Sequence, residues 1–189
     1  MERIKVMHNL GFVHNDLKLD NILIGNKDSS KIHLIDFGLS QSFYDLNGKH
    51  IEKMNLDKFS GNFMFASLNS CRGNNKSRRD DVQSIMLIMI FLLNENKLPW
   101  SNFNSKFKDQ DKSFSDYLGE RLEIQYVRQL FKMVPKSFRS VLKEILVLTF
   151  DQKPKYDYYI DKIKVEMMKE VQIGKDLQPK THVFEWNLN

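Results

Sequence analysis

The sequence predicts a single α+β domain that is mostly helical, and three patterns support this prediction. Nearly every residue of Val82–Leu93 is apolar, which indicates a helix buried on all sides. Apolar positions spread through Tyr117–Phe131 and Phe138–Phe150 indicate further amphipathic helices joined by short loops. Two short apolar runs, Ile22–Ile24 and Ile32–Ile35, flank a turn-forming segment and predict a small β-hairpin.

The first elements follow one another closely along the chain. Residues Glu2–His8 are predicted to be helical, because Asn9 and Gly11 are residue types that commonly end a helix. A polar loop follows, and residues 25–30, Gly-Asn-Lys-Asp-Ser-Ser, supply the turn of the hairpin. The hairpin therefore begins directly after a loop of polar and charged side chains.

The apolar stretch Val82–Leu93 is predicted to be a core helix. A membrane span needs about 20 apolar residues, and this stretch is shorter. Asp80 and Asp81 stand at its start, where negative charge suits the helix dipole, and Pro99-Trp100 follow it as a stop. We therefore expect no membrane partner.

Length and composition predict one domain over residues 1–189. A chain of 189 residues buries most of the surface that it exposes when unfolded, and 41% hydrophobic residues supply a core. The single cysteine, Cys71, cannot form an internal disulfide, and charges near Met1 do not fit a secretory signal. We expect an intracellular protein, cytoplasmic or nuclear.

The charge distribution predicts a solvated surface. The net charge is +5, but basic and acidic residues alternate in runs such as Lys106–Lys112 and Lys153–Lys164. A basic nucleic-acid-binding domain is disfavoured, because the charge comes with no recognition motif or aromatic stacking platform. Acidic protein partners remain compatible with this surface.

The candidate catalytic residues lie in residues 14–21, His-Asn-Asp-Leu-Lys-Leu-Asp-Asn, called the polar loop below. Phosphoryl transfer explains these residue types. A substrate hydroxyl needs a carboxylate to orient it and accept its proton, and Asp16 suits that role. Lys18 could neutralise charge that develops on the transferred phosphate.

The hairpin after the polar loop predicts a magnesium site. It leads into Asp36-Phe37-Gly38 and should bring the amide oxygen of Asn21 close to the carboxylate of Asp36. Magnesium prefers such oxygen ligands. Gly38 should leave room for the backbone bend that aims Asp36 at the ion.

These two segments resemble the protein kinase catalytic loop H-R-D-x-K-x-x-N and the D-F-G motif, with Asn15 in place of the usual Arg. The resemblance implies ATP and Mg²⁺ as cofactors. It also implies that Leu23 lies beneath the adenine ring, that His14 and Phe37 stack in the core, and that Asp81 anchors the backbone of the polar loop.

Further motifs resemble the casein kinase I family. Residues 61–69, G-N-F-M-F-A-S-L-N, are similar to its G-T-A-R-Y-A-S-I-N, and residues 77–81 match its S-R-R-D-D. Leu98-Pro99-Trp100, residues 153–156 and residues 183–187 are similar to its L-P-W, K-P-D-Y and V-F-D-W-N. The resemblance implies the C-terminal lobe of the kinase fold in a serine/threonine kinase, with protein substrates and a regulatory protein partner.

Three positions depart from the family pattern. Met64 stands where the family has an Arg that helps bind an anion or a phosphorylated substrate. Asn62 replaces the Thr that ties the catalytic Asp to the Lys, although an amide could hydrogen-bond both. Asn15 removes a cation that in many kinases meets a phosphorylated activation loop, so control by that route is not expected.

Residues 1–189 contain no glycine-rich loop, strand Lys paired to a helix Glu, or hinge segment. In the resembled family these parts cover the ATP phosphates and adenine. We therefore expect an N-terminally truncated kinase domain that holds the C-terminal lobe. The alternative is a catalytically inactive pseudokinase or docking module, which has no chemical need for Asp16, Lys18, Asn21 and Asp36 together.

Overall fold

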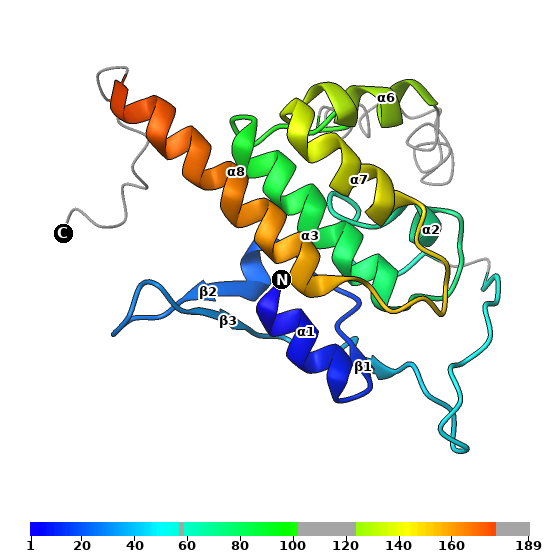
Figure 1. The fold of residues 1–189 in the computed structure, drawn as a ribbon. Coiled ribbons are helices and arrows are strands. Elements are labelled where there is room, and N and C mark those ends of the chain that lie inside the picture. The colour runs from blue at the N-terminus through cyan, green and yellow to red at the C-terminus, as the bar shows by residue number, and fades with distance from the viewer. Residues whose placement is uncertain (57–58, 102–123, 177–189) are drawn as a thin grey trace, which may run out of the picture.

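A computed structural model describes residues 1–56, 59–101 and 124–176, and helices dominate them. The helices α3 (Arg78–Leu93), α6 (Ile124–Lys132), α7 (Arg139–Leu146) and α8 (Tyr156–Asp176) gather on one side in Figure 1. The helix α1 (Glu2–Asn9) and the short strands lie on the other side. The predicted α+β class, mostly helical, is confirmed for the described residues.

The helix α3 is the centre of the core, as its apolar sequence predicts. Val82 and Ile90 are fully buried, and α3 packs against α1 and α7. Gln83 donates to the carbonyl of Ile145 at 3.2 Å, which adds a polar tie between α3 and α7. The largest fully buried side chains are Trp100, Tyr159, Phe43, Ile4, Met86, Ile90, Leu130, Leu142, Ile145 and His14.

The helix α3 begins earlier than the apolar stretch, because its first turn is capped by polar groups. The Ser77 backbone N–H donates to the Asp80 carboxylate at 2.8 Å, so Asp80 closes the helix start. Asp81 follows in the same first turn. Both carboxylates therefore sit where negative charge was predicted, and both are buried.

The predicted hairpin is present. Strand β2 (Ile22–Ile24) pairs antiparallel with β3 (Ile32–Leu34), so Ile22 lies opposite Leu34. Ile35 lies just outside the strand. A second antiparallel pair, β1 (Phe12–Val13) with β4 (Gln41–Ser42), was not predicted from the sequence.

The predicted first helix is confirmed as α1, and Gly11 follows it with φ of +89°. A side chain at Gly11 would also meet the Tyr44 ring, since an added Cβ would lie 3.2 Å from it. The left-handed backbone and the close aromatic ring both favour glycine here. The short helices η1 (Leu19–Asn21) and α2 (Leu68–Cys71) complete the first half of the chain.

Two predictions on the later helices were incomplete. Within Tyr117–Phe131 and Phe138–Phe150 the structure shows α6, the short η2 (Lys136–Phe138) and α7, while residues 117–123 lie outside the described part. The long helix α8 was not predicted, because charged residues surround its short apolar face of Tyr156, Tyr159 and Ile160 and obscure the helical pattern.

The motif at residues 183–187 lies outside the described residues. No helix of the described part is long and apolar enough to cross a membrane.

Truncating a core side chain of α3 should destabilise the protein strongly. Ile90→Ala should lower the free energy of unfolding by about 2–5 kcal/mol, because it leaves a cavity in a fully packed site. Leu93→Ala on the same helix, where the side chain is 58% exposed, should cost less than about 1 kcal/mol. Denaturant unfolding of both variants measures this, and equal losses would contradict the burial described above.

Candidate active site

The polar loop is held to the core by one buried carboxylate at the start of α3. Asp81 accepts the backbone N–H of His14 at 2.7 Å and that of Asn15 at 2.9 Å. The carboxylate is 2% exposed, so both bonds are shielded from water. The expected anchoring of the loop backbone by Asp81 is confirmed, and it fixes the two residues that precede Asp16.

His8 on α1 and Tyr156 on α8 connect this anchor to the first and last described helices. His8 Nε2 lies 2.9 Å from the Asp81 carboxylate, and His8 Nδ1 lies 2.6 Å from the Tyr156 hydroxyl. Burial raises the pKa of Tyr156, so its hydroxyl stays protonated and donates to Nδ1. The other ring nitrogen, Nε2, then carries the hydrogen and donates to Asp81, because an ionised carboxylate has no hydrogen to donate. Sequence reasoning missed both residues, since nothing local marks their pairing.

Three predicted site residues meet at the Asp16 carboxylate. Lys18 Nζ donates to Asp16 Oδ2 at 2.9 Å. The Asn21 amide donates to the Asp16 carbonyl at 2.9 Å and to Oδ2 at 3.3 Å. The hydrogen bond and the charge of Asp16 raise the pKa of Lys18, and the charges of Asp36 and Asp20 add to the effect. The side chains predicted to act together are therefore in contact.

His14 joins the polar loop to the segment that carries Asp36. Its ring is fully buried, and Nε2–H donates to the carbonyl of Ile35 at 3.1 Å. The N–H of Ile35 in turn donates to the carbonyl of Asn21 at 3.1 Å. These two bonds place the residue before Asp36 beside Asn21, which is the approach that the hairpin predicts.

The carboxylate of Asp36 is positioned by an unusual backbone. Asp36 itself has φ of +61°, a conformation that aspartate tolerates better than most residues. Its carboxylate lies 3.4 Å from the N–H of Gly38, and a Cβ added at Gly38 would lie 3.3 Å from it. Gly38 stands in the turn that follows, which the Ser40 N–H closes on the Phe37 carbonyl at 2.9 Å, so the predicted bend is present and the left-handed residue just before it is Asp36.

Asn21 and Asp36 are the two residues predicted to hold magnesium, and an amide and a carboxylate oxygen are ligands that this ion accepts. The two hydrogen bonds of the Asn21 amide nitrogen turn its oxygen away from Asp16, so that oxygen remains an acceptor for another partner. The Asp36 carboxylate is exposed. Among the described residues no group of three or more His, Cys, Asp or Glu could hold a metal. Such a two-residue site would lean on water and substrate phosphate for its other ligands.

Two of the residues implied by the resemblance are exposed. Leu23 on β2 is 47% exposed, and Phe37 is 53% exposed. Phe37 contacts the His14 ring, with a centroid distance of 5.3 Å, but the expectation that it lies in the core is wrong for this structure. About half of the Phe37 side chain therefore remains accessible to water.

The two substituted positions after Gly61 make local contacts. Asn62 accepts the N–H of Phe65 at 3.1 Å, while Lys18 reaches Asp16 directly. The expectation that Asn62 would tie Asp16 to Lys18 is therefore replaced by a turn-forming bond. Met64 lies against Trp100, whose indole N–H donates to the Met64 carbonyl at 2.8 Å.

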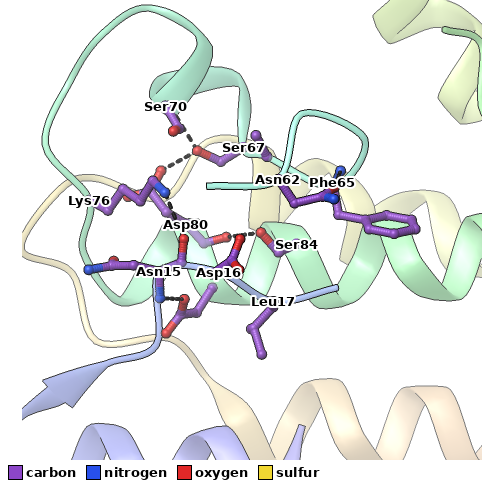
Figure 2. A pocket seen from close by; sticks show the side chains of 12 residues that line it. Asn15, Asp16, Leu17, Asn62, Phe65, Ser67, Ser70, Lys76, Asp80 and Ser84 are labelled. Atoms are coloured by element: carbon purple, nitrogen blue, oxygen red, sulfur yellow. Dashed lines mark hydrogen bonds between the residues drawn. The ribbon is translucent and has the colours of Figure 1, made fainter. Parts of the chain in front are cut away.

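A small polar cavity lies between the polar loop and α3 (Figure 2). Ser67 donates to Asp80 and Ser84 donates to the Asp80 carbonyl at its wall, and Lys76 reaches the carbonyl of Asn15. The cavity has room for about one water molecule, which is far too small for a nucleotide. It is therefore not a nucleotide pocket.

Comparison with known families agrees with this geometry. The family model described as "Protein kinase domain" matches residues 1–173. The match covers more than half of the chain and includes the polar loop, the hairpin, Asp36 and α3. The match does not identify a subfamily.

Removing the acceptor capacity of Asp81 should destabilise the protein. In Asp81→Asn one oxygen becomes an NH₂ group that faces N–H donors, so the free energy of unfolding should fall by about 1–3 kcal/mol. The matched control is Asp157→Asn, whose carboxylate pairs with Lys5 at 2.6 Å but is 75% exposed. The control should cost less than about 1 kcal/mol. Denaturant unfolding measures both, and a control that is as damaging as Asp81→Asn would refute the anchoring role.

Proposed function

The chain belongs to the protein kinase family, and from this premise we propose that it acts as a serine/threonine kinase of the casein kinase I type. It would transfer the γ-phosphate of ATP to hydroxyl groups of protein substrates. The observation that carries the proposal is the cluster of Asp16, Lys18 and Asn21, joined by hydrogen bonds of 2.9–3.3 Å. The subfamily rests on the similar motifs at residues 61–69 and 77–81.

Asp16 would orient the substrate hydroxyl and accept its proton. The Asp16 side chain is 9% exposed and bonded through Oδ2 to Lys18 and Asn21, which leaves Oδ1 as the acceptor for a hydroxyl. Lys18 would stay beside the reacting phosphate as a cation, since its raised pKa keeps it protonated. These groups position the nucleophile and balance charge, which is most of what a protein contributes to this chemistry.

ATP and magnesium would lie beside Asn21, Asp36 and Leu23. Bound magnesium would neutralise the negative charge that develops during phosphate transfer. The amide oxygen of Asn21 and the carboxylate of Asp36 would hold the ion, and the exposed side chain of Leu23 would contact the adenine ring. A nucleotide at this face would also cover apolar surface near Phe37.

The C-terminal-lobe assignment belongs to this proposal. Residues 1–189 contain no glycine-rich loop or strand lysine of the kind that covers ATP phosphates in the family. We propose that these residues correspond to the lobe below the nucleotide, and that the missing contacts come from a segment outside residues 1–189. The alternative is a binding module that uses the same lobe only for docking. Leu23 and Phe37 are exposed apolar side chains that a docked protein could cover, and this observation favours the alternative.

The remaining expectations extend the proposal. The partners would be protein substrates and a regulatory protein partner, with no nucleic acid and no membrane among them. An intracellular location in the cytoplasm or nucleus would supply ATP and suit the single, buried Cys71.

Loss of the metal ligand should separate catalysis from folding. In the full natural chain, Asp36→Asn should remove most phosphate transfer to a protein hydroxyl in the presence of ATP and magnesium. The control is Asp20→Asn, which changes an exposed carboxylate in the polar loop and should reduce phosphate transfer far less. Equal losses would reject the assigned roles, and a wild-type chain that folds but transfers no phosphate would favour the docking module.

The substitution at Met64 should weaken any preference for pre-phosphorylated peptides. A charge-assisted contact is worth about 1.5–3 kcal/mol, and a thioether cannot supply it. The Met64 sulfur instead has a hydroxyl neighbour, Ser101 Oγ at 3.9 Å. Turnover on primed and unprimed versions of one peptide tests this, and a strong preference for the primed version would count against it.

A further inference from the structure

Lys76 is a buried lysine that bonds two segments on either side of the candidate base. Its side chain comes from the residue before the cap of α3, and the residue is 9% exposed. The ammonium group donates to the carbonyl of Asn15 at 2.7 Å and to that of Ser60 at 2.7 Å. Asn15 directly precedes Asp16, and Ser60 directly precedes Gly61, so one cation joins the polar loop to the 60–62 segment. Figure 2 shows the side of this contact that involves Asn15.

Gly61 shows how closely the three parts approach. A Cβ added to Gly61 would lie 2.9 Å from Lys76 Nζ, 3.0 Å from the Asn15 carbonyl and 3.3 Å from Asp16 Oδ1. Its φ of +91° also favours glycine. A side chain at this position would therefore collide with the ammonium group and the Asn15 carbonyl, and glycine lets the three parts approach this closely.

The electrostatic surroundings show why the cation is tolerated there. Burial lowers the pKa of Lys76, and the charges of Asp81, Asp80 and Asp16 oppose that shift, with a smaller contribution from Cys71. Two short bonds to carbonyl oxygens partly replace the water that the ammonium group has lost. A hydrophobic side chain would fill the same space without joining the two backbones.

We propose that Lys76 is a positioning residue that clamps the polar loop to the 60–62 segment and so holds Asp16 in place for proton transfer. The clamp acts through the carbonyls of Asn15 and Ser60, and Lys76 itself touches no substrate. For its effect on catalysis the proposal rests on the proposed kinase function. The clamp as such does not, because it is a statement about two backbone segments.

Hydrogen–deuterium exchange of the full natural chain tests the clamp without any activity. Lys76→Met keeps the side-chain length and removes the donors, so exchange at residues 15–17 and 60–62 should rise while the α7 amides stay unchanged. Lys76→Gln keeps neutral N–H donors and should show a smaller rise. Lys97→Met, which changes a 69% exposed lysine, is the matched control and should show none. No rise at residues 60–62, or a uniform rise that includes α7, would overturn the clamp.

Steady-state kinetics tests the link to Asp16. With ATP, magnesium and a protein substrate, Lys76→Met should lower kcat by about 10- to 100-fold, as expected for a misplaced catalytic group, and leave the KM for ATP within about twofold. An unchanged kcat despite faster exchange would overturn the positioning role. A wild-type chain without phosphate transfer would instead refute the proposed function, and the exchange result would still decide whether the clamp exists.

Discussion

The structure depends on one buried carboxylate. Asp81 accepts two backbone N–H groups of the polar loop and the ring N–H of His8, all inside the core. Because α3 is the best buried helix, a group fixed to its first turn is as rigid as the core itself. The polar loop, which has little apolar surface of its own, takes its rigidity from this contact.

The same contact joins parts that are distant in sequence. Through His8 the carboxylate reaches Tyr156 at the start of α8, and Tyr156 is 148 residues from His8 along the chain. Lys5 and Asp157 add an exposed pair at 2.6 Å between the same two helices. The first and last described helices thus hold the polar loop together. The three linked residues, His8, Asp81 and Tyr156, are all buried.

Sequence patterns predicted the elements whose cause is local. The apolar run of α3, the hairpin turn at residues 25–30 and the order of Asp16, Lys18 and Asn21 each leave a mark within a few residues. The link between His8 and Tyr156 leaves none, because it exists only once the chain has folded. The left-handed backbone at Asp36 is a similar case: the sequence predicted the bend near Gly38, which the structure contains, but gave no sign that Asp36 itself adopts a positive φ.

The backbone at Asp36 divides the candidate site into two halves that tolerate change differently. Asp16 is tied to the core through Asp81, whereas Asp36 is exposed and held mainly by its own turn. Because the Asp36 side chain is exposed and its hydrogen bond within the turn is long, at 3.4 Å, replacement by asparagine or glycine, which also accept a left-handed backbone, would leave the fold intact. Over evolutionary time the half that carries Asp36 can therefore change while the chain stays folded. A lineage could lose the acidic group at this position and keep the domain for other uses, whereas a change at Asp81 would weaken the fold that holds Asp16.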